Sequence, residues 1–142
     1  MSSGRWLGAL VGIAMLMSAH PAAAVEGEQE LNAVKAAEEW LALVDAGKQD
    51  ESWKTASALL QRNISSEQWQ TTVSGVRTPL GAVVSRERVS AIYRNELPGA
   101  PDGEYVIIQY QTSFTNKKAA IETVTPMKES DGTWRVSGYF IR

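Results

Sequence analysis

The sequence predicts an α+β domain in which helices come first and an antiparallel sheet follows. Up to about residue 80, apolar residues recur at three- and four-residue spacing, which is typical of amphipathic helices. From residue 82 the spacing changes to two, which is typical of strands. Short turn segments separate the expected strands, so neighbouring strands should pair antiparallel. We therefore expect three helices packed on one face of a curved four-stranded meander.

Residues 1–24 have the pattern of a secretory signal peptide. Arg5 gives a positively charged start, residues 6–17 form an apolar run, and Ala22-Ala23-Ala24 supplies the small residues of a cleavage site. The run is shorter than the roughly 20 residues that span a bilayer. We expect cleavage after Ala24 and export to the periplasm or the medium. Residues 25–142 should then form one domain without a membrane span.

Three helices are expected before residue 81. Gly47 is a stop signal for the first, and Asp50 and Glu51 favour the start of the second through the helix dipole. Ser65 and Gln68 have capping-box spacing at the start of the third helix. Pro79 and Gly81 should end this helix. The apolar stripes of the three helices cover residues 31–44, 53–64 and 69–80.

Four strands are expected at residues 82–97, 104–115, 119–128 and 133–141. In the last strand, the set Trp134, Val136, Gly138 and Phe140 is the better core face. A two-residue turn at Asp131-Gly132 would then place Thr123, Thr125 and Met127 on the inner face and point Glu122 outward.

The other two strands are phased in the same way. A turn at Asn116-Lys117 carries four residues of the second strand inward, namely Ile108, Tyr110, Thr112 and Phe114. In the first strand we expect the inner set to be Val83, Ser85, Glu87, Val89, Ala91 and Tyr93. This phasing aims Glu87 toward the helices unless a β-bulge intervenes.

Two resemblances follow from these patterns. The order of helices, long strand and meander resembles the cone-shaped, cystatin-like folds of the nuclear-transport-factor-2-like group. The segments 97–106, 122–127 and 131–139, with Ala37-Glu38-Glu39-Trp40-Leu41 and Pro79-Leu80-Gly81, are similar to an exported bacterial family, the domain of unknown function numbered 4019. This resemblance implies an exported bacterial protein and implies no activity.

The composition excludes several chemistries. The chain has one histidine, His20 in the expected signal peptide, and no cysteine, so the mature protein would carry neither. Disulfides, thiol nucleophiles, histidine-based catalysis and zinc sites built on these residues are thereby excluded. No glycine-rich phosphate loop or calcium-loop pattern is present, so we expect no metal and no cofactor. The net charge of -2 argues against nucleic-acid binding.

General acid–base chemistry is the catalytic class left open. An inward Glu87 is the weak candidate, because a carboxyl in a closed cavity suits proton transfer. The alternative is that a bulge exposes Glu87 or that it pairs with an arginine. The side chains expected to line the same pocket and to bind a ligand are Tyr93, Tyr110, Thr112, Thr123, Thr125 and Trp134.

Two further groups of residues allow a functional or a purely structural interpretation. The local basic cluster could hold an anionic ligand, but a solvated strand face is the favoured interpretation of Arg77, Arg86, Arg88 and Arg94. Stacking on a sugar is one role for the tryptophans, but core packing is favoured for Trp40, Trp53, Trp69 and Trp134.

The function we expect is that of a non-enzymatic module that binds a small apolar or amphipathic ligand or a protein partner. The alternative is a small lyase, isomerase or hydrolase that uses Glu87. A protein partner would use the outer sheet face, and a homodimer through that face is a further hypothesis. The residues expected on the outer face are Gln109, Gln111, Glu122, Arg135 and Tyr139.

Overall fold

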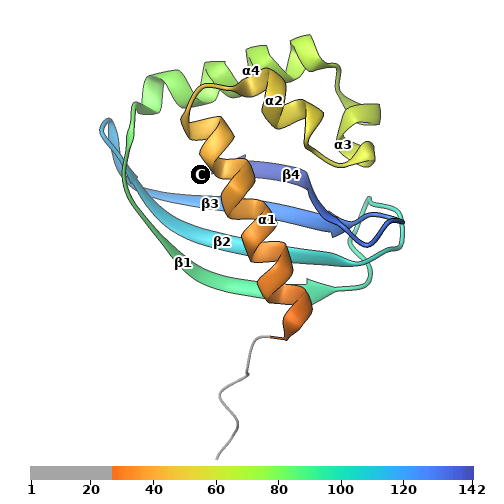
Figure 1. Ribbon diagram of the computed structural model, residues 1–142. Coiled ribbons are helices and arrows are strands. Elements are labelled where there is room, and N and C mark those ends of the chain that lie inside the picture. Colours follow the sequence, from red (N-terminus) through yellow and green to blue (C-terminus); the bar gives the residue numbers. More distant parts are fainter. Residues whose placement is uncertain (1–26) are drawn as a thin grey trace, which may run out of the picture.

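Four helices precede four strands in this computed structural model, which describes residues 27–142 (Figure 1). The elements are α1 Glu28–Asp45, α2 Gln49–Lys54, α3 Ala58–Asn63, α4 Ser66–Leu80, β1 Val83–Arg94, β2 Tyr105–Phe114, β3 Lys117–Lys128 and β4 Trp134–Ile141. The expected signal peptide and its cleavage site lie outside the described residues. Within residues 27–142, no helix has both the length and the apolar character needed to cross a membrane.

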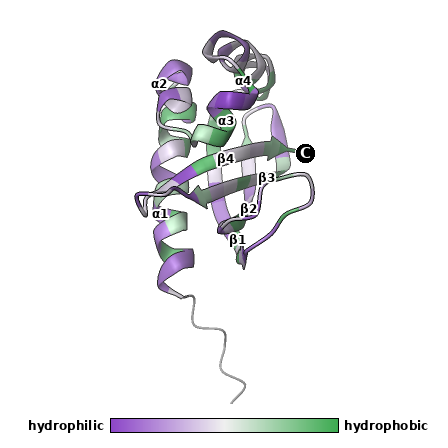
Figure 2. Ribbon diagram, turned by 90° about the vertical axis from the view of Figure 1, so that its right-hand side faces the viewer, coloured by the Kyte–Doolittle hydropathy of each residue, from purple (hydrophilic) through white to green (hydrophobic). Residues whose placement is uncertain are grey.

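The strands form one antiparallel sheet in the order β1-β2-β3-β4. The sheet is curved, α1 crosses its inner face, and α4 runs beside β4 (Figure 1). Turned by 90°, the molecule shows α1 on one side of the strands and mixed hydropathy along that helix (Figure 2). The predicted α+β class, with helices before a curved antiparallel sheet, is confirmed.

The number of helices differs from the prediction, because the expected second helix is two short ones. α2 ends at Lys54 and α3 begins at Ala58. Between them Ser57 is fully buried, its side chain accepts a hydrogen bond from the backbone of Leu60, and its own N–H donates to Val136 of β4 at 2.8 Å. This bond to β4 takes the N–H that a continuous helix would use, so the chain turns there.

The core lies between α1 and the sheet. α1 contributes the predicted stripe, which includes Val34, Ala37, Leu41 and Val44. Trp40 stands at its centre, 5.9 Å from the ring of Trp69 and 5.2 Å from that of Tyr139. Buried in this way, the indole N–H groups need partners. The backbone oxygen of Ser52 accepts from Trp40 and its hydroxyl accepts from Trp69.

The four tryptophans of residues 27–142 pack in or against the core, as the core-packing interpretation predicts. Trp40 and Trp69 are buried, while Trp53 and Trp134 are partly buried against the same cluster. Trp53 of α2 donates to the backbone oxygen of Ile64, which lies in the connection between α3 and α4, at 2.9 Å. The indoles therefore hold the short helices in place.

The β2–β3 turn differs from the prediction by one residue. Phe114 pairs with Lys117, so the turn residues are Thr115 and Asn116 rather than Asn116 and Lys117. After a register shift, Tyr110 pairs with Glu122 instead of Thr123. The predicted inner set of β2 is confirmed by its burial, but β3 presents the opposite face from the expected one. A one-residue slip reverses every side chain of a strand.

The β3–β4 hairpin also departs from the simple two-residue turn. Glu129 donates to Thr133, and Gly132 adopts a φ of 85° within the loop. A register shift between Thr125 and Pro126 leaves Ser137 as an extra residue on β4. Trp134 and Val136 therefore lie on the inner face as expected. After the bulge the phase reverses: Tyr139 enters the core and Phe140, at 58% exposure, points out.

Two bulges reverse the phase within β1. The register shifts fall at Val84 and Val89, and both side chains are exposed. Between them Arg86 pairs with Thr112 and Arg88 pairs with Tyr110, which places both arginines on the inner face. The bulges explain why strict alternation fails in this strand, although Val83, Ala91 and Tyr93 do face inward.

Candidate functional site

Glu87 does not point toward the helices. It pairs with Gln111 on the outer face, and its side chain is exposed. It lines an open groove of about 460 Å³ beside Gln111, Lys118 and Ile121. The expectation of an interior Glu87 is wrong, because the bulge at Val84 shifts the strand by one residue.

The predicted ligand-lining residues divide between the two faces. Tyr110 and Thr112 are buried on the inner face, and Tyr93 and Trp134 pack partly buried against the core. Thr123 pairs with Gln109 and Phe140, and Thr125 pairs with Gly138, which places both threonines on the outer face. The inner set is therefore interrupted where Thr123 was expected, and Glu122 takes its place.

Glu122 is the acid in the interior. It is fully buried, and its carboxylate accepts hydrogen bonds from the hydroxyls of Thr112 and Tyr139. Arg86 adds two more bonds, from Nε at 2.7 Å and from Nη2 at 3.2 Å. The expectation that Glu122 and Tyr139 lie on the outer face is therefore wrong. These donors come from β1, β2 and β4, so hydrogen bonds link Glu122 of β3 to each of the other three strands.

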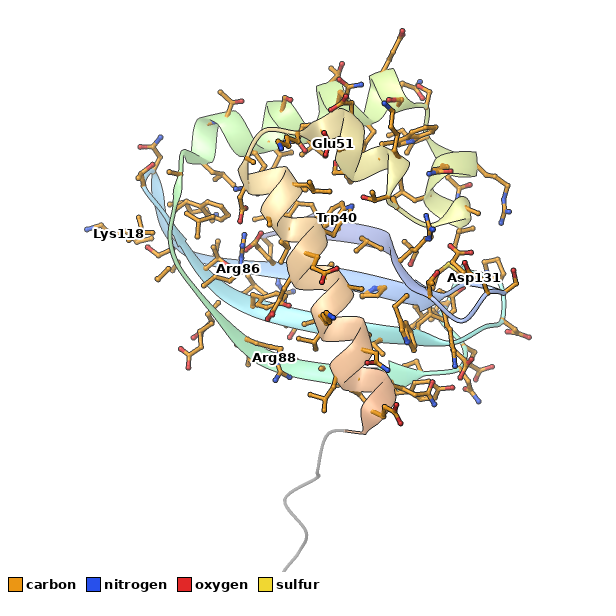
Figure 3. All side chains as sticks on the ribbon, in the orientation of Figure 1. Trp40, Glu51, Arg86, Arg88, Lys118 and Asp131 are labelled. Atoms are coloured by element: carbon orange, nitrogen blue, oxygen red, sulfur yellow. The ribbon has the colours of Figure 1, made fainter. Side chains whose placement is uncertain are left out.

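Arg86 extends this cluster to the helices. Its Nη1 and Nη2 lie 2.7 Å and 3.0 Å from the carboxylate of Asp45, at the last position of α1. Arg77 of α4 donates from Nη2 to the same carboxylate at 2.8 Å and lies over the ring of Phe114. Figure 3 shows Arg86 rising from β1 into the space beside α1. Asp45, Arg77, Arg86 and Glu122 form a continuous cluster, called here the ion-pair cluster.

The electrostatics follow from this geometry. Partial burial disfavours the charged form of Asp45, but the hydrogen bonds and charges of Arg86 and Arg77 outweigh it and lower the pKa of that carboxyl. Burial also opposes the charge of Arg86, yet its two carboxylate partners raise its pKa. Burial and the neighbouring Glu122 raise the pKa of Tyr139, so this phenol stays protonated as a donor.

The basic cluster expected from the sequence is only partly a solvated face. Arg77 and Arg86 enter the interior, and Arg88 lies on the inner face beside Tyr110. Arg94 is exposed and donates to the backbone oxygen of Tyr93. The solvated-face interpretation is therefore wrong for Arg77 and Arg86, because the bulges turn β1 and because α4 brings Arg77 to the end of α1.

Three buried polar atoms have no hydrogen-bond partner within the described residues. They are the hydroxyl of Tyr110 and the Nε and Nη1 atoms of Arg77. Burial first, and the charge of Glu38, raise the pKa of Tyr110. Unpaired buried donors are costly, so each marks a place where a further acceptor would be stabilised.

Several grooves open at the surface of the described residues. One groove of about 300 Å³ runs between α4 and the end of β4, and is called here the α4–β4 groove. Its lining residues are Trp69, Thr72, Val73, Val76, Arg77, Tyr139, Phe140 and Ile141. A second groove of about 450 Å³ lies between α1 and the start of β4, with Trp134, Glu39 and Arg135 among its walls.

No group of three or more histidine, cysteine, aspartate or glutamate side chains is placed to hold a metal ion in residues 27–142. The sequence prediction missed Glu122, Arg86 and Arg77 as interior residues. The inward placement of Tyr110 was predicted correctly, so a register one residue different in the β2–β3 hairpin would have found Glu122 opposite it. Nothing local to Arg77 distinguishes it from an exposed helix residue.

Comparison with known proteins gives a family and no activity. A search of curated proteins found no match. A family model described as "Protein of unknown function (DUF4019)" matches residues 36–139, which run from the middle of α1 to Tyr139 in β4. The matched range contains the whole ion-pair cluster and most of the α4–β4 groove. The chain belongs to this family of proteins of unknown function.

Proposed function

We propose that this protein is an exported, non-enzymatic binding module that holds an apolar or amphipathic partner in the α4–β4 groove. The observation that carries the proposal is the lining of that groove. Val76 is 45% exposed and Phe140 is 58% exposed, although both are large apolar side chains. Grouped apolar surface of this kind is stabilised when a partner removes it from water.

The chemistry of the groove supports an amphipathic partner. Arg77 and Tyr139 lie among its apolar walls, and both also belong to or contact the buried cluster around Glu122. Binding sites typically combine apolar walls with a few placed polar groups that fix the orientation of the ligand. A partner bound in the groove would therefore contact side chains that hold α4 against the sheet.

An enzymatic role has less support. Glu87 is exposed on the outer face of the sheet, opposite Gln111. Glu122 has the burial of a catalytic acid, but Thr112, Tyr139 and Arg86 occupy its carboxylate. A substrate would have to displace an ion pair and two hydroxyl groups to reach it, which costs several kcal/mol.

Titration with 1-anilinonaphthalene-8-sulfonate, an apolar fluorophore with one anionic group, tests the proposal. Trp69 lines the groove, so bound dye should accept energy from tryptophan emission. The double variant Val76→Ser and Phe140→Ser should bind the dye at least about fivefold more weakly than the wild type, since it loses apolar contact area. Ile92→Ser is the matched control, because Ile92 is 43% exposed on β1, away from the groove.

Urea unfolding of each variant checks that the folded state is retained. The proposal is contradicted if the folded double variant binds the dye as tightly as the wild type, or if only Ile92→Ser weakens binding. The export component has its own test. Expression of the full chain in a Gram-negative bacterium should yield periplasmic protein whose mass begins at Val25, and an uncleaved cytoplasmic product would contradict it.

A further inference from the structure

The end of β4 has backbone groups that face away from the sheet. Ile121 and Arg142 exchange both of their backbone hydrogen bonds, at 2.8 Å and 3.1 Å. In an antiparallel ladder such pairs alternate with pairs that make no bonds to each other. Tyr139 and Ile141 are therefore the residues whose N–H and C=O groups point away from β3.

Only the first part of this edge has a backbone hydrogen-bond partner in residues 27–142. Ser57, just before α3, donates to the backbone oxygen of Val136. Within residues 27–142, no other segment forms a backbone hydrogen bond with the outward groups of Tyr139 and Ile141. Proteins usually cover or charge such an edge, because it pairs readily with another strand.

The open edge and the α4–β4 groove are the same place. Tyr139 and Ile141 line the groove, and Val76 on α4 faces them with 45% of its surface exposed. A groove between a helix and an open strand edge offers main-chain hydrogen bonds on one side and apolar contacts on the other. This combination is one of the recurring ways in which proteins bind extended peptides.

The polar groups of Arg77 at this groove are already engaged or buried. Arg77 is 8% exposed, its Nη2 donates to Asp45, and its Nε and Nη1 atoms are buried. The groove therefore offers a partner apolar walls and the backbone groups of the strand edge.

We propose that an extended peptide segment of another protein, with alternating apolar residues, adds to β4 as a fifth strand in the α4–β4 groove. The peptide backbone pairs with Tyr139 and Ile141. The open edge is about four residues long, or roughly 13 Å at 3.3 Å per residue. The inference rests on the proposed function and adds the class of partner to it.

Selection from a display library of random eight-residue peptides, followed by synthesis of the enriched sequences, tests this proposal. Enriched peptides should alternate apolar and polar residues. N-methylation of alternate backbone amides should weaken binding by about tenfold or more, while N-methylation of the intervening amides should have little effect.

Variants of the protein locate the binding site. Phe140→Ser should weaken peptide binding, and Ile92→Ser should not. The proposal is overturned if no peptide is enriched, if methylation at every position is tolerated, or if Ile92→Ser alone weakens binding. Dye binding that depends on Val76 and Phe140, without peptide enrichment, would retain the proposed function and reject the peptide. Loss of both results would reject the proposed function as well.

Discussion

At the scale of single residues, the defining feature of this protein is a carboxylate in its interior that is fully paired. Glu122 accepts from two hydroxyls and from Arg86, so each of its oxygens has donors. Burial of two charges is costly, and removal of one partner leaves the other without compensation. The net stabilisation from the cluster is therefore small, but a fold in which any one of its partners is missing would be strongly destabilised.

Glu122→Gln tests the role of this carboxylate. The amide keeps the shape but removes the charge that balances Arg86, so we expect a loss of about 3–5 kcal/mol in the free energy of unfolding. Urea denaturation measures this loss. Glu87→Gln is the control, because that side chain is exposed and should change stability by less than about 0.5 kcal/mol. Equal effects of the two substitutions would contradict the structure.

The lowered pKa of Asp45 predicts a dependence of stability on pH. Because the folded protein holds this carboxyl below its usual pKa, the stabilisation is present above the unfolded value of about 3.9 and is lost as pH falls through the folded value. At neutral pH, Asp45→Asn should therefore be less stable than the wild type. Denaturation at a series of pH values should show the difference shrinking below about pH 4. A difference that stays constant down to pH 2 would be inconsistent with the ion pairs to Arg77 and Arg86.

At the scale of elements, the connection from α4 to β1 depends on Gly81. Its φ is 78°, and a Cβ atom there would lie 1.9 Å from Oγ1 of Thr115 in the β2–β3 turn. Gly81→Ala should therefore destabilise the fold by more than about 1 kcal/mol, since both the backbone angle and the contact oppose it.

Gly75 provides the opposite case in the same helix. It lies within α4 with nothing within 4 Å of an added Cβ, so Gly75→Ala should stabilise the protein by about 0.4–1 kcal/mol. Thermal unfolding should show a lower melting temperature for Gly81→Ala and a higher one for Gly75→Ala than for the wild type. Destabilisation by Gly75→Ala would show that α4 is not the helix described here.

The elements also show what the sequence could predict and where it could not. The stripe of α1 from Val34 to Val44 and the capping box at Ser65 follow local rules, and the structure contains both. The predicted stripe of α4 is buried at Trp69 and Val73, but Val76 is 45% exposed. The split between α2 and α3 depends on a bond from Ser57 to β4, which no local pattern contains. The bulges at Val84, Val89 and Ser137 have the same character, since valine and serine also suit an unbroken strand.

The same bulges and turns decide which residues of the candidate site the sequence could predict. The inward placement of Tyr110 and Thr112 was predicted correctly, because β2 itself carries no extra residue. Glu122 was predicted to face outward because the expected phase of β4 contained no bulge at Ser137, after which Gly138 and Phe140 face outward with Thr125 and Thr123. Arg77 was recognised as basic, but its burial depends on the position of the end of α1. Contacts between distant segments therefore determine the site, and the periodicity of each segment does not.

At the scale of the whole molecule, the ion-pair cluster and the α4–β4 groove are physically continuous. Arg77 and Tyr139 line the groove, and through Asp45, Arg86 and Glu122 they connect α1, α4 and the sheet. Exposed Phe140 and Val76 lie on its surface side. The molecule thus has an ion-pair cluster in its interior beside a strand edge whose last residues have no backbone hydrogen-bond partner in residues 27–142.

A homodimer through the outer face stays a prediction at this scale. The exposed apolar residues of β1, which are Val84, Val89 and Ile92, offer a surface for it that is separate from the groove. Sedimentation at tens of micromolar should show a dimer that Ile92→Lys disrupts. A strictly monomeric mass for the wild type would count against this hypothesis and would leave the groove proposal unaffected.

The most direct test of the central claim is amide hydrogen exchange at Tyr139 and Ile141 with and without a selected peptide. The account predicts that both amides exchange rapidly in the free protein, since their N–H groups face away from β3, and become protected when the peptide binds. The amide of Phe140, which faces β3, should be protected in both states. Unchanged exchange at Tyr139 and Ile141 in the presence of bound peptide would contradict the addition of a strand to β4.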